Sequence, residues 1–282
     1  MVIWAEEVEK ARCRFAGRIH KTPIITCKSI DLIAGVILFS VTHSSGNHGQ
    51  GLAWAASQVG VLCYVAVPRN APPSKMEAMI EYGAKVELCD ATVKSREDTC
   101  ARLAKDLSYC IVEPFDDSNI ICGQGTIGAE IIEQLPDVDA IFLAIGGGGM
   151  ASGIVAYMNE VKPSVKVFLI EPQGKHLAVY LKSGVLTMKR DVVDTIADGI
   201  RVLKIGRNCY PILKSCSDNV ITVTDDEIRV ALRLIWTRTK QRVEPSAAVP
   251  LAGLLKISPS DHRLKKVVLV LCGGNVDLDF VP

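Results

Sequence analysis

The chain has 282 residues and a mass of 30.5 kDa, enough for one large domain or two domains of ordinary size. Hydrophobic residues make up 49% of the sequence and charged residues 22%, which excludes an intrinsically disordered protein. The 32 basic and 31 acidic residues nearly cancel, so no positive field for nucleic acid is expected. Strong apolar runs such as 141–145 and 267–271 are far shorter than the roughly 20 residues of a membrane span, so no membrane contact is expected either.

The N-terminal charges and the cysteine spacing both indicate a cytoplasmic protein. Glu6, Glu7 and Glu9 stand where a signal peptide would need an apolar stretch. No two of the ten cysteines form a C-x-x-C pair, which argues against structural zinc. Without a secretion signal, the cysteines are also not expected to form a disulfide framework, and most of them are predicted to be small buried apolar residues.

The first half of the chain alternates between helical and β-rich stretches. Apolar spacing and punctuation by glycine and proline predict two strands, over 61–67 and 85–89, and three helices, over 51–58, 75–82 and 95–107.

The second half contains continuous apolar runs, which are typical of buried strands. Strands are predicted over 141–145, 167–170 and 267–271. Thr224 and Glu227 form a capping box that opens a helix running to about residue 239. Apolar strands separated by helices favour a parallel sheet covered on both faces, so the predicted fold class is doubly wound α/β.

Four glycines, Gly146–Gly149, follow the predicted strand 141–145 and precede a helical stretch that begins near Met150. Glycines allow the backbone to approach a ligand closely, and the following helix N-terminus favours an anion, so this segment predicts a phosphate cradle. It lacks the Lys-Ser/Thr of a P-loop and the spacing of a dinucleotide fold. The structural alternative is a tight strand-to-helix turn.

Two further polar, glycine-containing turns lie at strand ends. One is the segment 44–50 (SSGNHGQ) and the other is 272–275 (CGGN). In open α/β sheets, ligands bind at the carboxyl ends of the strands, so these turns and the glycine run are expected to meet at one edge. Helix capping is the competing explanation for 44–50, and a charged surface loop is the competing explanation for Glu244 in VEPSAA.

Six segments identify a family by their order: SSGNHGQ, GQGT, GGGGM, TIADG, VEPSAA and CGGN, from residue 44 to residue 275. The chain closely resembles the pyridoxal-phosphate enzymes of the serine/threonine dehydratase and serine racemase family, and eukaryotic serine racemases resemble it most. The resemblance implies the tryptophan-synthase-β-like fold type II with two doubly wound domains. The large domain would comprise 1–38 and 117–282, and the small domain 39–116.

The resemblance also implies cofactor contacts. Asn47 would bind the phenolic oxygen of pyridoxal 5′-phosphate, Cys272 would face the pyridine nitrogen, and Glu244 would be a carboxylate on the cofactor side. A neutral partner such as Cys272 does not hold the pyridine ring protonated, which limits the ring as an electron sink. The cofactor phosphate would be held by backbone N–H groups of Gly146, Gly147, Gly148, Gly149 and Met150.

The substrate site would lie in the 44–50 turn. Ser44, Ser45 and His48 would hold the amino-acid substrate, serine or threonine, and Ser45 matches the second acid/base of racemases. The family implies α-proton abstraction followed by racemisation or by loss of the β-hydroxyl with release of ammonia. It also implies a homodimer. The sequence leaves two alternatives for the reaction, racemisation or dehydration, and two for the substrate, serine or threonine.

The chain departs from the family pattern at two binding positions. Glu171 matches a glutamate that binds Mg or Ca, but the acidic partner expected six residues later is Leu177. The asparagine expected before GQGT is replaced in the stretch 113–115 (EPF).

The largest departure concerns the Schiff-base lysine. The family carries it in a segment resembling S-F-K-x-R-G-A between IHKTP and SSGNHGQ. This chain has Lys21, which is part of IHKTP, and Lys28 between the two motifs, and neither has that context. The chain as printed is therefore expected to be inactive. The missing segment is explained by a skipped exon or by a mispredicted gene model. The alternative is an evolved, non-catalytic regulatory protein that binds pyridoxal phosphate or a nucleotide.

Overall fold

The computed structural model describes residues 5–15, 24–26, 37–42, 48–58, 60, 62–69, 71, 73–107, 111–185, 193–257, 264–277 and 279–282. The chain forms two compact units. The larger unit comprises Met1–Ser44, Phe115–Gly273 and Pro282, and the smaller unit comprises Ser45–Pro114 and Gly274–Val281. The domain boundary at residue 39 that the sequence suggests falls inside a strand, β2, which belongs to the sheet of the larger unit.

A six-stranded sheet forms the centre of the larger unit. Its spatial order is β1-β2-β8-β5-β6-β7, and apart from β1, which runs antiparallel to β2, neighbouring strands are parallel. The continuous apolar sequences of β5 and β8 agree with this position, because a strand in a covered parallel sheet is buried on both faces. The strands are β1 (Ile24–Thr26), β2 (Ile37–Thr42), β5 (Ala140–Ala144), β6 (Lys166–Pro172), β7 (Val220–Val223) and β8 (Lys266–Leu271).

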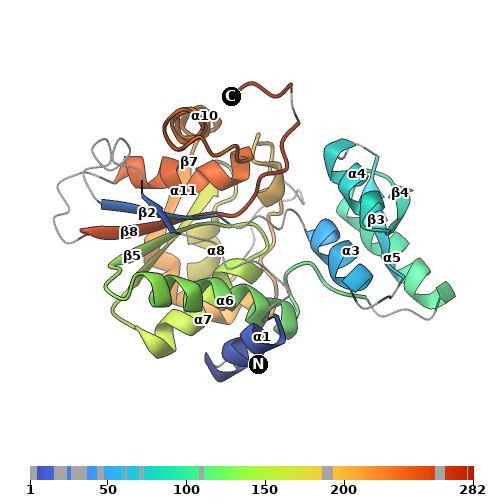
Figure 1. Cartoon of the computed structure of the whole chain (residues 1–282), viewed down its shortest axis with the longest axis horizontal. Coiled ribbons are helices and arrows are strands. Elements are labelled where there is room, and N and C mark those ends of the chain that lie inside the picture. Colours follow the sequence, from blue (N-terminus) through green and yellow to red (C-terminus); the bar gives the residue numbers. More distant parts are fainter. Residues whose placement is uncertain are drawn as a thin grey trace. The chain divides into compact units, whose positions relative to one another are not determined.

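Helices cover both faces of this sheet (Figure 1). On one face, Ile141 and Leu143 of β5 pack in a core with α6 (Ser118–Gln134) and α7 (Gly149–Val161), and α1 (Ala5–Phe15) packs outside them. On the other face α11 (Pro245–Lys256) contacts β5, β6, β7 and β8, with α10 (Asp225–Leu234) packed on α11. The doubly wound arrangement predicted for this part of the chain is thus confirmed.

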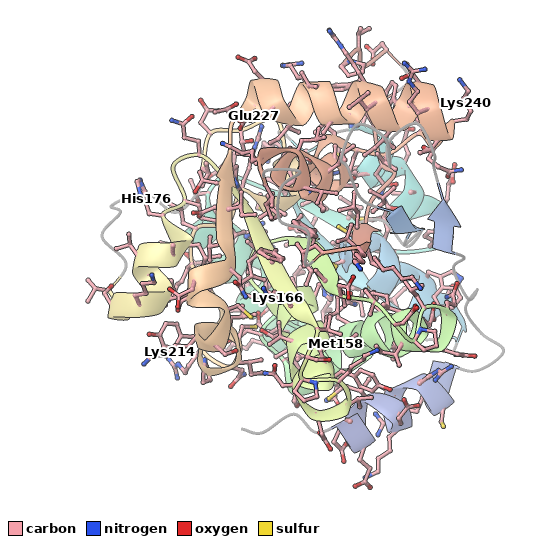
Figure 2. The ribbon with its side chains drawn as sticks, turned by 90° about the vertical axis from the view of Figure 1, so that its left-hand side faces the viewer. Met158, Lys166, His176, Lys214, Glu227 and Lys240 are labelled. Atoms are coloured by element: carbon pink, nitrogen blue, oxygen red, sulfur yellow. The ribbon has the colours of Figure 1, made fainter. Side chains whose placement is uncertain are left out.

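The predicted capping box opens α10. The Thr224 hydroxyl accepts the Glu227 N–H, while the Glu227 carboxylate accepts the Thr224 N–H. Beyond α10 the chain continues as a π-helix, Ile235–Thr239. The helix ends there because the next residue, Lys240, has a left-handed conformation (φ 61°). Figure 2 shows Glu227 and Lys240 at opposite ends of this helical rod. The shorter elements of the larger unit are α8 (Leu177–Ser183), η1 (Asp198–Ile200), α9 (Cys209–Leu213) and η2 (Lys214–Asn219).

In its described part, the smaller unit is built on two parallel strands, β3 (Tyr64–Pro68) and β4 (Lys85–Cys89). Three helices accompany them: α3 (His48–Gln58), α4 (Pro73–Glu81) and α5 (Val93–Leu107). The core is small and consists of Ala53, Cys63, Val67, Met79 and Ala84. Across the described residues of both units, none of the helices has the length and apolar character needed to cross a membrane.

Candidate active site in the larger unit

The glycine run connects the end of β5 to the first turn of α7. Gly148 has a φ of 103°, a conformation that favours glycine. A Cβ at Gly147 would lie 2.5 Å from the ring of Phe115, and a Cβ at Gly149 would lie 2.6 Å from the Phe115 carbonyl oxygen. Only glycines therefore fit beneath Phe115. The first N–H groups of α7 have no acceptor within the helix, so this turn offers donors to an anion.

Neighbouring segments fix the glycine run on its other side. The Ile145 N–H donates to the Ile170 carbonyl (3.1 Å), and the Gly206 N–H donates to the Gly147 carbonyl (2.9 Å). The Asp116 carboxylate in turn accepts the N–H groups of Arg207 and Asn208, each at 2.8 Å. These bonds leave the loop conformation pre-organised before any ligand binds.

Three motifs meet around Glu244, which precedes α11. Its N–H donates to the Gly273 carbonyl at 3.0 Å, and a Cβ at Gly273 would lie 2.5 Å from the Glu244 carboxyl carbon. A Cβ at Gly199 would lie 3.0 Å from Glu244 Oε1, and the Gly199 N–H donates to the Ser246 hydroxyl at 2.9 Å. TIADG, VEPSAA and the start of CGGN are therefore in contact.

Cys272 follows the last residue of β8 and is half-buried beside Glu244. Burial raises the pKa of its thiol to about 12, and the nearby negative charge of Glu244 acts in the same direction. The thiol is therefore neutral near pH 7. A neutral thiol can donate its S–H to an unprotonated ring nitrogen of a ligand. It has no negative charge with which to stabilise a protonated one.

The predicted residues of the smaller unit fall mostly outside the described part of the chain. Ser44, Ser45 and Asn47 belong to a stretch that is not described. His48 begins α3, with Nε2 3.2 Å from the Val112 carbonyl oxygen, and burial lowers its pKa. The side-chain amide nitrogens of Gln50 and Asn275 are buried without a hydrogen-bond partner, so each is a donor that a ligand can satisfy.

Glu171 lies at the end of β6, where it is almost fully buried. One carboxylate oxygen accepts the Leu177 N–H at 2.8 Å and the other accepts the Thr222 hydroxyl at 3.0 Å. Burial raises the pKa of this carboxyl group. Among the described residues, no group of three or more His, Cys, Asp or Glu side chains is placed to hold a metal ion.

Sequence reasoning missed Phe115 and Asp116 as supports of the glycine run. From the sequence, the stretch EPF is only a departure from the family pattern. The two consecutive aspartates that follow could have signalled this role. A helix N-terminus needs one capping residue, and Asp117 caps α6 by accepting the Asn119 N–H (2.8 Å). The second aspartate, Asp116, is then available for another contact.

A covered parallel sheet with a glycine cradle at the carboxyl ends of its strands defines a ligand-binding α/β protein of the open-sheet class. Residues 39–273 match the family described as pyridoxal-phosphate dependent enzyme, and the chain belongs to that family. The mouse serine racemase is 38% identical over 313 residues that cover 96% of this chain and 91% of the relative.

Solved structures agree with this assignment. The crystal structure of a pyridoxal 5′-phosphate-dependent aspartate racemase matches with a TM-score of 0.94 and 35% identity, covering 99% of this chain and 98% of that chain. The crystal structure of a T.th. threonine deaminase matches with a TM-score of 0.89 and 32% identity, covering 99% of this chain and all of that one (100%). The predicted family and the predicted fold type II are confirmed.

Proposed function

We propose that this chain carries the cofactor site of a pyridoxal-phosphate dependent serine racemase or serine/threonine dehydratase, and that in its printed form it binds the cofactor without catalysing the reaction. The observation that carries the proposal is the glycine run held under Phe115, with Gly146 next to Gly199, which in turn lies next to Glu244. It is supported by the serine racemase and threonine deaminase relatives. The intact gene product would act on a small amino acid in the cytoplasm as a homodimer.

The residues of the larger unit fit pyridoxal phosphate. The cradle Gly146–Met150 would accept the phosphate, because a Cβ at 147 or 149 has no space and the α7 N-terminus offers N–H groups. Cys272 would face the pyridine nitrogen as a neutral thiol, and Glu244 would flank the ring. When bound, the cofactor withdraws electrons from the amino acid and makes the α-proton more acidic.

The residues of the 44–50 turn would bind and orient the substrate. Ser44 and Ser45 would hold the substrate carboxylate, with His48 as a further residue of the substrate site. Asn47 would donate a hydrogen bond to the phenolic oxygen of the cofactor. Ser45 would exchange a proton with the α-carbon on the face opposite the missing lysine. These roles rest on the match of SSGNHGQ to the family motif.

The second half of the proposal is supported by the sequence before the 44–50 turn, which has no stretch matching S-F-K-x-R-G-A. The alignment with mouse serine racemase spans 313 positions and this chain has 282 residues, so the relative has residues without a counterpart here. Lys28 lies between IHKTP and SSGNHGQ, and Lys21 lies within IHKTP itself. Without the lysine, the base on one face of the substrate is missing, so proton abstraction fails although phosphate binding survives.

Borohydride reduction in the presence of pyridoxal phosphate tests the inactive form. The cofactor is expected to bind and to be displaced by inorganic phosphate, whereas reduction labels surface lysines weakly and at random. Gly147→Val is expected to abolish the phosphate-sensitive binding. Stoichiometric labelling of one residue, for instance Lys21 or Lys28, would overturn the loss of the catalytic lysine. Equal binding by wild type and Gly147→Val would overturn the cradle.

A longer transcript tests the reaction itself. If the locus makes a product that includes the lysine segment, this product is expected to release pyruvate from serine and to interconvert the serine enantiomers. Ser45→Ala in that product should suppress racemisation and D-serine elimination more than L-serine elimination, because lysine and Ser45 serve opposite faces. Equal loss in all three reactions would reduce Ser45 to a positioning group.

The rival function is a regulatory protein that binds pyridoxal phosphate or a nucleotide without catalysis. The completeness of the cofactor motifs is compatible with it, because phosphate binding needs no lysine. Sequencing all transcripts of the locus discriminates between the two. Transcripts that all lack the lysine segment favour the rival.

A further inference from the structure

Lys175 is a buried lysine in the loop between β6 and α8. Its exposed fraction is 0%, which is unusual for an amino group, and the loop places it between Glu171 and Leu177. Figure 2 shows the next residue, His176, at the turn from β6 into α8. A lysine is retained at such a place only where its amino group is well satisfied.

The Lys175 amino group joins three segments. Nζ donates to the Gly146 carbonyl oxygen at 2.8 Å and also to the Val202 carbonyl oxygen. Gly146 is the first residue of the glycine run, and Val202 follows the TIADG motif by three residues. The side chain therefore connects the loop after β6, the phosphate cradle and the segment that contacts Glu244.

The family resemblance implies a divalent cation in this region, with Glu171 as a ligand. The residues present do not fit one. Ca²⁺ takes about six to eight oxygen ligands and Mg²⁺ about six, and carboxylates free to coordinate supply the charge that holds either ion. Here Leu177 stands where the second carboxylate is expected, and both Glu171 oxygens already accept hydrogen bonds from Leu177 and Thr222.

We propose that the amino group of Lys175 takes the place of the divalent cation, so that the glycine run is held by a covalently tethered donor and the protein needs no Mg or Ca. Lys175 is thus a positioning residue for the phosphate cradle. The same carbonyl oxygens that Lys175 contacts, together with the Glu171 charge, form an environment that attracts a cation.

The two hydrogen bonds of the Lys175 amino group do not depend on its charge. Burial lowers the pKa of Lys175 to about 7, and the Glu171 charge acts against this shift. A neutral amine still has two N–H groups, enough for the two carbonyl oxygens. In either protonation state, Nζ therefore satisfies the Gly146 and Val202 carbonyl oxygens without a metal ion.

Cation binding by the wild-type chain tests the proposal without cofactor or activity. Equilibrium dialysis against Mg²⁺, Ca²⁺ and Mn²⁺ followed by elemental analysis is expected to show no stoichiometric ion. Proteolysis of the larger unit is expected to proceed at the same rate with these ions and with EDTA. One bound ion per chain, or protection by an ion that EDTA reverses, would overturn the proposal. Neither result depends on the proposed enzymatic function.

Substitution of Lys175 supplies the converse test. Lys175→Ala should accelerate proteolysis of the larger unit about tenfold or more, because two buried carbonyl oxygens lose their donor. The matched control is Lys214→Ala at an exposed lysine of η2, which should leave the rate unchanged. In Lys175→Ala/Leu177→Asp, Mg²⁺ or Ca²⁺ should restore protection and EDTA should remove it.

The outcomes of the double variant also decide the proposal. The proposal would be overturned if the double variant resisted proteolysis as well as wild type and cations did not change its rate. The Lys175 amino group would then not be taking the place of a cation. If the double variant does not fold with or without cations, the dialysis result for the wild-type chain decides.

Discussion

The ring of Phe115 lies directly against Gly147, so that a Cβ added at residue 147 would stand 2.5 Å from three of the ring carbons. The backbone of Phe115 blocks Gly149 in the same way. One aromatic residue outside the glycine run thus restricts two of its four positions to glycine. Because the next residue, Asp116, holds Arg207 and Asn208, displacement of Phe115 is expected to disturb both sides of the cradle.

Gly147→Ala should therefore weaken phosphate-sensitive binding of pyridoxal phosphate and destabilise the larger unit by about 1–3 kcal/mol through overpacking. Phe115→Ala in the same chain should restore part of the binding, because it removes the ring that the new methyl group meets. Gly51→Ala is the control, since a Cβ there meets no atom within 4 Å. Cofactor fluorescence titration and thermal unfolding measure both effects. Additive losses in the double variant would contradict the contact.

Asp116→Ala should destabilise the Gly206–Asn208 turn, because the N–H groups of Arg207 and Asn208 lose their acceptor. These groups are partly accessible to water, so the expected loss is about 1–2 kcal/mol. Hydrogen exchange of the two amides should rise. Asp218→Ala is the control, because its ion pair with Lys182 is exposed and worth little. Unchanged exchange at 207 and 208 would contradict the anchoring role.

The Cys272 thiol should resist alkylation up to alkaline pH. Burial disfavours the thiolate, so the raised pKa of about 12 keeps the reactive form scarce below it, and the rate should climb as the pH rises toward that value. Iodoacetamide labelling from pH 7 to 10, read by mass spectrometry, should modify the exposed Cys13 first. Labelling of Cys272 as fast as Cys13 at pH 8 would show that the thiol is not buried as described.

The smaller unit should be poorly stable. Several large apolar side chains in it are exposed, among them Ile80 (58%), Leu88 (45%) and Ile111 (50%). Burial of one such side chain contributes about 1.5–3 kcal/mol, against about 5–15 kcal/mol for a whole domain. We expect binding of apolar dyes, aggregation through the strand edge and early proteolysis between residues 45 and 114. A single sharp melting transition without dye binding would refute this and favour the non-catalytic alternative.

Local signals in the sequence are sufficient for much of the larger unit. The strands β5 and β8 and the helix opened by Thr224 follow from apolar runs and from a capping box, each of which is encoded within a few residues. The glycine run is identifiable for the same reason, because its conformational requirement is local.

Long-range contacts explain what the sequence alone does not reveal. Lys175 has no local mark of burial, because its acceptors, Gly146 and Val202, come from other segments of the fold. The pairing of β2 with β8 joins residues such as Val41 and Val270 that lie far apart in the chain. No periodicity of a single segment encodes such a partner.

The position of β8 constrains how the protein is made. It lies between β2 and β5, yet it is the last of the described strands in chain order. Until Lys266–Leu271 has emerged from the ribosome, the pair β1–β2 and the group β5–β6–β7 remain separate, and β2 and β5 each lack the neighbour that β8 supplies in the finished sheet. A nascent chain of this protein therefore completes its described six-stranded sheet only when its last described strand has been made.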